Sequence, residues 1–276
     1  MDIGITTRSY TGMTNAEAAA AMRSAGFTCT ELCFSQTDSN IWRYNGRSDL
    51  SEMTDSRFSE IVATYREQGI SVEALGVFTN LIEPDDSELE QNLLYYKRMM
   101  ELAAREGIPT VPTECGFIPG QRGVNADCYE SRFDRLKTSL TTLCRYAEEY
   151  DVTVSLECCV LDVVPSAKRA ADLHDQIGSD RLKFLLDPAN LIANSSEEDM
   201  FRYMGKHVAY FHGKDRCVND TYGKLVGDGD IRWADFLKMY HQQCEGIPFI
   251  LEYARAENAP MVYDRVQAYD RQAKGL

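Results

Sequence analysis

The order of strand-like and helix-like segments is the feature that most constrains the fold of this chain. Eight short apolar runs alternate with segments whose apolar residues recur at helical spacing. Two parallel strands need a long crossover between them, usually a helix, so this alternation indicates a parallel sheet with helices outside it. Eight is also the strand number that closes such a sheet into a barrel. The runs are IGIT (3–6), TCTELCF (28–34), SVEALGVF (71–78), TVPTECG (110–116), TVSLECC (153–159), LKFLLD (182–187), VAYFHG (208–213) and PFILEY (248–253).

The intervening segments carry the start and stop signals of helices. They begin near residues 15, 56, 87, 128, 166, 197 and 233. Glycine tolerates the left-handed conformation that often follows a helix. Four of the segments end at such a glycine: Gly26, Gly69, Gly107 and Gly178. Side chains able to cap a helix predict N-caps at Thr14, Asp55 and Ser87.

An open, doubly wound sheet is the alternative to a barrel. It would favour a Gly-rich turn of the GxGxxG type after the first strand, and residues 6–10 read TTRSY instead. The length of 276 residues is close to the roughly 250 of a barrel with eight strands. No linker or low-complexity tract interrupts the sequence. We therefore predict an α/β fold, a (β/α)8 TIM barrel of parallel strands, with residues 1–276 forming a single domain.

Charge and cysteine content exclude several classes of function. With 29 basic and 43 acidic residues the net charge is −14, which repels the phosphate backbone of nucleic acids. No apolar run approaches the roughly 18 residues of a membrane span, and the start MDIGITTRSY does not resemble a signal peptide. The nine cysteines are odd in number and form no CxxC. We expect a cytoplasmic protein that binds neither nucleic acid nor membranes.

Four residues of metal-ligand type stand at the ends of four successive strand-like runs. They are Glu157 in VSLEC, Asp187 in KFLLDPAN, His212 in AYFHGKD and Glu252 in FILEYA. In a barrel of parallel strands the carboxyl ends of neighbouring strands converge on one mouth. Three carboxylates and an imidazole at one place suit a divalent cation with mixed oxygen and nitrogen ligands.

Each of the four residues also has an ordinary structural explanation. Glu157 would pair with a lysine, and Glu252 would be an exposed strand end. Asp187, before Pro188, would open a turn or cap a helix. His212 would be a hydrogen-bonded core residue. The four together favour the metal site, because carboxylates at the ends of buried strands are costly unless they are paired or bound to a cation.

Motifs in the second half of the chain resemble a known family. They are LE (156–157), LDPAN (186–190), FHGKD (211–215), VGDGDIRW (226–233) and ILE (250–252). In this order they resemble the xylose-isomerase-like TIM-barrel superfamily. It contains sugar and sugar-phosphate isomerases and epimerases, inosose dehydratase, hydroxypyruvate isomerase and endonuclease IV. The first half matches through Glu31 in TELC and through its strand–helix rhythm, so the resemblance is motif-specific from about residue 153 onward.

The resemblance implies a function and a set of roles. It implies that Glu157, Asp187, His212 and Glu252 bind one divalent metal, manganese first, with magnesium, cobalt or zinc as alternatives. Glu157 and Glu252 would form the acid/base pair that moves a proton on an open-chain sugar or sugar phosphate through a cis-enediolate. Relatives are often dimers or tetramers, so the resemblance leaves a homo-oligomer open, and nothing in these residues establishes one.

Three positions depart from the family pattern. Asn190 stands where many relatives have a histidine. Val163 and Val218 stand where ketose 3-epimerases have a glutamate and an arginine. A free-ketose 3-epimerase therefore fits less well than an enzyme for a differently substituted sugar.

Several residues are candidates for substrate contact. Loops after strands build the active site of this fold, and the long ones span 35–54, 79–86, 117–127 and 215–232. Trp42 and Phe78 would form apolar walls against a sugar face or simply pack within their loops. The polar candidates are Glu114, Asn190, Lys214, Arg216 and Arg255. The three cations would meet a phosphate or carboxylate, or be solvated loop charges, while Glu114 would reach the pocket or bridge to a lysine.

Two other functions remain open on the same scaffold. An inosose-dehydratase-type lyase would use the same metal and carboxylates, followed by loss of a β-hydroxyl. A barrel without catalysis would only bind a ligand. An endonuclease of the endonuclease IV type is excluded more firmly, because of the four histidines only His212 falls at the predicted mouth.

Overall fold

The chain folds into a closed barrel of eight parallel strands in the order β1 to β8, as the strand–helix alternation predicted. The computed structural model describes residues 1–120, 123–124 and 126–276. The barrel closes where Gly4 of β1 faces Ile250 of β8 in parallel register. The strands are β1 (Ile3–Ile5), β2 (Cys29–Leu32), β3 (Ser71–Leu75), β4 (Thr110–Glu114), β5 (Thr153–Glu157), β6 (Leu182–Leu186), β7 (Val208–Gly213) and β8 (Phe249–Leu251).

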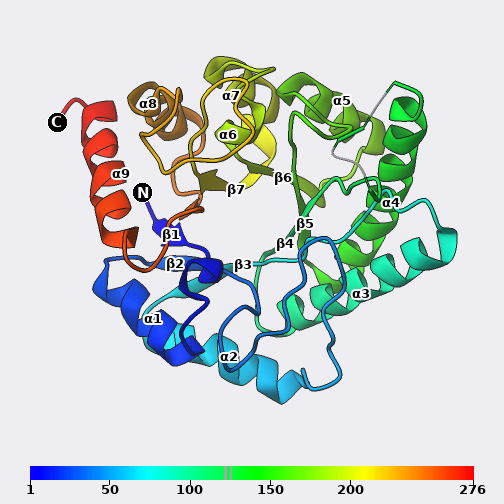
Figure 1. The fold of residues 1–276 in the computed structure, drawn as a ribbon, viewed down its shortest axis with the longest axis horizontal. Coiled ribbons are helices and arrows are strands. Elements are labelled where there is room, and N and C mark those ends of the chain that lie inside the picture. Colours follow the sequence, from blue (N-terminus) through cyan, green and yellow to red (C-terminus); the bar gives the residue numbers. More distant parts are fainter. Residues whose placement is uncertain (121–122, 125) are drawn as a thin grey trace.

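Helices surround the barrel on the outside (Figure 1). They are α1 (Asn15–Ser24), α2 (Asp55–Glu67), α3 (Asp86–Arg105), α4 (Tyr129–Tyr150), α5 (Ala167–Ile177), α6 (Pro188–Leu191), α7 (Glu197–Met204), α8 (Trp233–Gln243) and α9 (Ala259–Ala273). Two short 3-10 helices, η1 (Thr7–Tyr10) and η2 (Gly205–His207), flank β1 and β7. All seven predicted helices are present.

Some details of the predicted helices were wrong. The N-cap of α2 is Thr54, one residue before the predicted Asp55, because its hydroxyl accepts the Arg57 N–H at 3.1 Å. The N-cap of α3 is Asp85 rather than Ser87, because its carboxylate accepts the Glu88 N–H at 2.9 Å. The predicted cap at Thr14 is confirmed.

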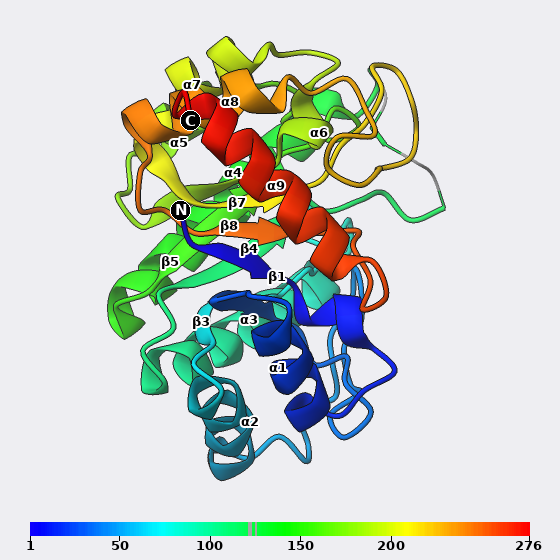
Figure 2. The ribbon, with the colours of Figure 1, turned by 90° about the vertical axis from the view of Figure 1, so that its left-hand side faces the viewer.

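Two helices lie outside the predicted segments. Helix α6 is one turn that opens directly after β6, and α9 follows the last strand. Figure 2 shows α9 passing in front of β8. Its buried positions Val262 and Val266 are four residues apart, which is helical spacing. The four helix-ending glycines are confirmed, since all have positive φ, between 64° and 93°.

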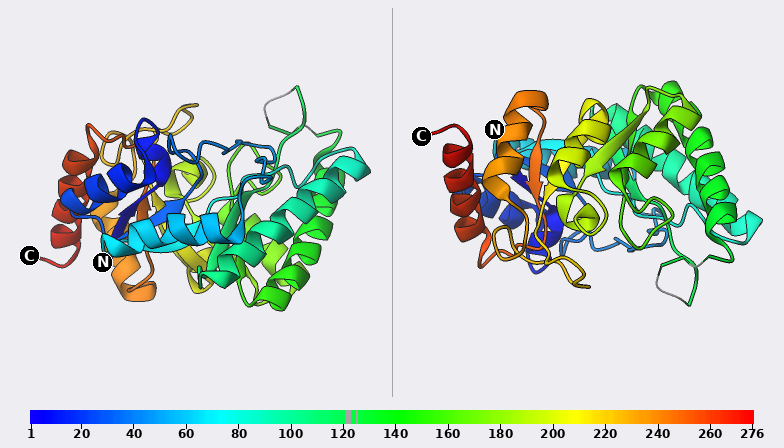
Figure 3. Two further views of the ribbon diagram at one scale, coloured as in Figure 1. Left: turned by 90° about the horizontal axis from the view of Figure 1, so that it is seen from below. Right: turned by 90° about the horizontal axis from the view of Figure 1, so that it is seen from above.

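Side-chain alternation along the strands positions the mouth of the barrel. Successive residues of a strand face opposite sides, so residues two apart share a face. Leu185, Tyr210 and Ile250 belong to a small buried cluster that is separate from the larger core containing the outward-facing residues. Each stands two residues before Asp187, His212 or Glu252, so the barrel interior changes from apolar to polar at one level. The long loops gather on one side of the molecule (Figure 3).

Candidate metal centre

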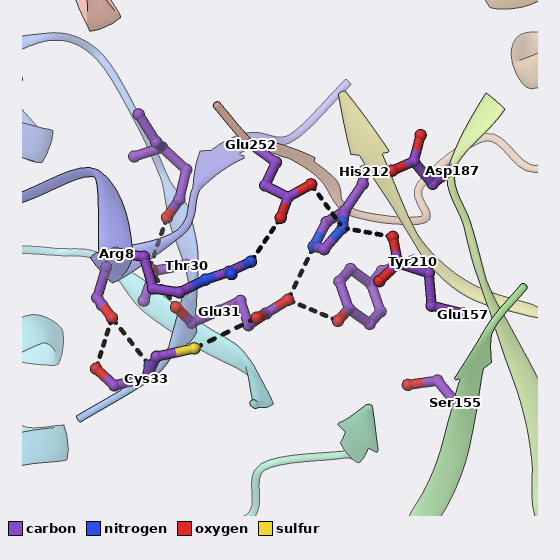
Figure 4. Close-up of polar contacts among 12 residues, drawn as sticks. Arg8, Thr30, Glu31, Cys33, Ser155, Glu157, Asp187, Tyr210, His212 and Glu252 are labelled. Atoms are coloured by element: carbon purple, nitrogen blue, oxygen red, sulfur yellow. Dashed lines mark hydrogen bonds and ion pairs between the residues drawn. The ribbon is translucent and has the colours of Figure 1, made fainter. Parts of the chain in front are cut away.

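Four side chains from β5, β6, β7 and β8 meet inside the barrel mouth. Glu157, Asp187, His212 and Glu252 each offer a ligand atom, and these atoms lie within 4.8 Å of one another. Glu157, Asp187 and His212 are at most 3% exposed, and the Glu252 side chain is 11% exposed. Figure 4 shows Glu252 and Glu157 on two sides of the His212 ring. The structure thus brings together the four residues predicted from the strand ends.

The ammonium of Lys214 lies among the same carboxylates. Its Nζ is 2.7 Å from Asp187 Oδ2, 2.6 Å from Glu252 Oε2 and 3.8 Å from Glu157 Oε1. Lys214 is 5% exposed, and these carboxylates raise the pKa of its amine well above the ordinary value even though burial opposes the charge. Sequence analysis placed Lys214 near the mouth but not in the cluster. The site is therefore built to hold positive charge.

Asp187 divides its two oxygens between a structural and a site role. Its Oδ1 accepts the Ala189 N–H at 2.9 Å and caps α6, which is the ordinary explanation considered above. Its Oδ2 is buried and lies 2.7 Å from the Lys214 ammonium. Burial raises the pKa of Asp187 to about 7, against the opposing charge of Lys214. A buried carboxylate oxygen that faces a cationic group, among two more carboxylates and an imidazole, fits a divalent cation.

Glu31 orients the imidazole of His212 and was missed as a site residue by sequence analysis. Its Oε2 lies 2.8 Å from His212 Nε2 and accepts the Tyr210 hydroxyl at 2.7 Å. Burial alone would raise the pKa of Glu31, but His212, Arg8 and Tyr210 hold it below the ordinary value. An ionised Glu31 favours the proton on Nε2. Nδ1 then faces the carboxylates, 3.4 Å from Glu157 Oε1 and 3.7 Å from Glu252 Oε2.

Arg8 is a second missed residue. Its Nη2 lies 2.6 Å from Glu252 Oε1, across 244 positions of sequence (Figure 4). The guanidinium carbon is 5.2 Å from the Trp42 ring centroid and 5.4 Å from that of Phe78. The two aromatic residues predicted as apolar walls thus contact Arg8. Lys214, Arg8 and His212 lower the pKa of Glu252 far below the ordinary value although burial opposes this.

Asn190 links Glu157 to Arg216. Its amide donates to Glu157 Oε1 at 2.9 Å, and its carbonyl accepts from Arg216 Nη2 at 3.2 Å. Lys214 and His212 keep the pKa of Glu157 below the ordinary value against the effect of burial. Asn190 therefore holds Glu157 in place as a hydrogen-bond donor.

Asp215 explains why the HGKD and VGDGDIRW motifs occur together. Its buried carboxylate accepts N–H groups from Gly227 at 2.9 Å and from the Trp233 indole at 2.8 Å. It also accepts the backbone N–H of Arg216 at 2.8 Å. A Cβ at Gly229 would lie 2.2 Å from Asp215 Oδ1, so only glycine fits there. One carboxylate thus folds the β7–α8 loop over the mouth.

Glu114 faces the mouth from the end of β4. Both of its oxygens accept from the Tyr44 hydroxyl, at 2.8 and 3.0 Å, and no ion pair with a lysine is present among the described residues. Burial, together with the charge of Glu157, raises the pKa of Glu114 to about 7.

A cavity of about 1290 Å³ opens above the cluster. It is lined by Glu252 and Lys214, and also by Trp42, Glu114, Asn190, Arg216 and Arg255. Six of the seven candidates for substrate contact therefore line one cavity, and Phe78 does not. A second hollow, of about 650 Å³, lies between α4 and α5 and is lined by none of them.

Comparison with known proteins agrees with the fold. The chain superposes on an IOLI protein with a bound zinc atom, with a TM-score of 0.77, 17% identity and 99% of each chain covered. It superposes on a D-psicose 3-epimerase with a TM-score of 0.77, 15% identity and 100% coverage of both chains. For a 3-keto-D-glucoside 4-epimerase from E. coli the TM-score is 0.76 and the identity 12%, with 97% of this chain and 99% of that chain covered.

These identities are low enough that the likeness shows the fold alone. No curated protein sequence matches the chain. None of the helices in the described part of the chain is long and apolar enough to cross a membrane. A sequence model of the xylose isomerase-like TIM barrel matches residues 19–274. The chain therefore belongs to the xylose isomerase-like TIM barrel family.

Proposed function

We propose that this protein is a divalent-metal-dependent isomerase or epimerase that acts on a small sugar or sugar phosphate. The observation that carries the proposal is the convergence of ligand atoms from Glu157, Asp187, His212 and Glu252 within 4.8 Å, with Glu252 lining one large cavity. The family and the epimerases among the similar structures support the same reaction class. The residues that would hold the metal are these four.

The donor set favours manganese, with magnesium, cobalt or zinc as alternatives. When bound there, such an ion supplies Lewis acidity that makes a C–H next to a sugar carbonyl easier to deprotonate.

Glu157 and Glu252 are the proposed proton carriers. Both are held ionised by neighbouring cations, so each is able to accept a proton. Asn190 fixes one oxygen of Glu157, and Arg8 fixes one oxygen of Glu252. One carboxylate takes the carbon-bound proton, and the other delivers a proton to the opposite face or to the neighbouring carbon. Delivery to the opposite face gives an epimer, and delivery to the neighbouring carbon gives an isomer.

The walls of the cavity supply the remaining contacts. Trp42 offers an apolar surface, while Glu114, Asn190, Lys214, Arg216 and Arg255 offer hydrogen bonds and charge. Asn190 is already bonded to Glu157, so it takes a supporting role in place of the histidine found in many relatives. We further propose that the protein is a cytoplasmic, single-domain homo-oligomer, on the basis of the cysteine pattern and the family resemblance.

The test is exchange of carbon-bound hydrogen in D2O. Metal-loaded protein is incubated with keto-sugars, keto-sugar phosphates and inososes, and deuterium incorporation and products are read by NMR. We expect an epimer or isomer that carries deuterium. A dehydrated product without an epimer would instead establish the lyase, and the absence of a stoichiometric metal after purification and loading would point to a barrel that only binds.

Two variants assign the proton carriers. Glu157→Gln and Glu252→Gln should each abolish turnover, because an amide cannot carry the proton, while circular dichroism shows an intact fold. Full activity in either variant removes that residue from the pair. Chelation should stop turnover, and manganese, cobalt or magnesium should restore it. An unchanged rate after complete metal removal would contradict the metal-dependent reaction.

A further inference from the structure

Two cationic side chains of the described chain belong to buried residues, and they have opposite surroundings. Lys214 is 5% exposed and Arg216 is 8% exposed. Lys214 lies among three carboxylates. No carboxylate among the described residues lies within ion-pair distance of the Arg216 guanidinium. Arginine stays charged in proteins, so the charge is not removed by loss of a proton.

The hydrogen-bond donors of the Arg216 side chain are also only partly used. A guanidinium has five N–H donors. Within the described part of the chain, the Arg216 side chain makes one hydrogen bond, from Nη2 to the carbonyl oxygen of Asn190 at 3.2 Å. Its Nε is buried and has no partner. A buried charge with unsatisfied donors is costly unless a ligand completes it.

The neighbouring acidic groups do not fill this role. Asp215 is adjacent in sequence, but its carboxylate is occupied by backbone N–H groups and by the Trp233 indole. Glu157 is reached only through Asn190. Arg8, which also lines the cavity, is already paired with Glu252 at 2.6 Å. Arg216 lines the cavity together with Asn190 and Lys214, so its free donors are available to a ligand there.

We propose that Arg216 anchors an oxyanion subsite in the cavity wall, and that the ligand is a polyhydroxy compound carrying a carboxylate or phosphate. The planar fork of a guanidinium matches both groups through two parallel hydrogen bonds. Asn190 contacts both Arg216 and Glu157, so the anionic group binds on the Glu157 side of the cavity. That the ligand is a sugar rests on the proposed function, whereas the anion subsite rests on Arg216 alone.

The test uses three-carbon probes that lack a carbonyl and are not turned over. Glycerol, glycerate and glycerol 3-phosphate carry no charge, a carboxylate and a phosphate on similar skeletons. Their dissociation constants for the metal-loaded protein are measured by isothermal titration calorimetry. We expect at least one anion to bind about tenfold or more tightly than glycerol, since hydrogen bonds to charged groups are the stronger class. The tighter of the two anions identifies the group.

Three variants assign the effect. Arg216→Met should abolish the preference for the anion and leave glycerol binding unchanged. Arg216→Lys should retain part of the preference, because the charge remains without the fork. Arg271→Met removes the same charge from the exposed end of α9 and should behave as the unaltered protein. The melting temperature of Arg216→Met without ligand should not fall, because the substitution removes an unpaired buried charge.

The proposal is overturned if neither anion binds more tightly than glycerol, or if Arg216→Met keeps the preference. Should Arg216→Met fail to fold, the Arg216→Lys measurement decides, and unchanged anion affinity in that variant refutes the paired-donor arrangement. The binding assay involves no turnover. A protein that binds anions through Arg216 but exchanges no deuterium would therefore refute the proposed function and leave the subsite intact. A protein that exchanges deuterium but shows no anion preference would refute the subsite and leave the proposed function intact.

Discussion

Replacement of Lys214 by methionine tests how the candidate metal centre balances its charge. The Lys214 ammonium lies 2.6 Å from Glu252 and 2.7 Å from Asp187, between oxygens that a metal would need. A bound cation must therefore displace the ammonium from these contacts. Methionine has a similar length and carries no charge, so Lys214→Met removes the competitor and leaves the carboxylates without a partner.

The burial of the Lys214 ion pairs sets the expected size of the loss in stability and of the gain in metal affinity. Removing one partner of a buried ion pair costs about 3–5 kcal/mol, so the metal-free variant should be less stable by that order. For chains somewhat shorter than this one, each kcal/mol of lost stability lowers the melting temperature by roughly 2–4 °C, so the melting temperature should fall by about 6 °C or more. The same interaction no longer opposes metal binding. Since about 1.4 kcal/mol corresponds to a factor of ten, manganese should bind between about a hundredfold and a few thousandfold more tightly.

Calorimetric titration with manganese and thermal unfolding, with and without the metal, measure the two quantities. The matched control is Lys224→Met. Lys224 belongs to the same β7–α8 loop, but its side chain is 35% exposed and its ammonium lies as far as 3.9 Å from the Asp220 carboxylate. The control should keep the metal affinity of the unaltered protein. A Lys214→Met protein with unchanged or weaker manganese affinity, and with an unchanged melting temperature, would refute the reasoning.

Two further outcomes follow from the groups around the cluster. Glu31→Gln should weaken manganese binding about tenfold, because Glu31 orients the proposed metal ligand His212 and loss of such a group usually costs about tenfold or more in metal affinity. An unchanged calorimetric Kd would contradict that role. The pKa of Glu114 is raised from 4.5 to about 7, so its ionisation in the folded state costs stability as pH rises through that range. The melting temperature of Glu114→Gln, measured relative to that of the unaltered protein, should therefore increase from pH 5 to pH 8. A constant difference across that range would show that Glu114 does not titrate there.

The barrel and the grouping of Glu157, Asp187, His212 and Glu252 could be predicted because both depend on local patterns. Alternation of apolar and polar residues tells which side chains face the barrel interior, and the end of each apolar run tells the level at which they stand. Once the strands are parallel, residues at their carboxyl ends meet without further information. The same reasoning placed Arg216 near the mouth.

Pairing between distant segments could not be predicted in this way. Arg8 reaches Glu252 only because β1 closes the barrel against β8, and Glu31 reaches His212 across the barrel interior. Nothing in the sequence around Lys214 and Arg216 distinguishes the cation held by three carboxylates from the cation with none. Periodicity along the chain determines which side chains are buried together at the mouth. Which charges then find partners depends on barrel closure and side-chain direction, and these belong to the tertiary structure.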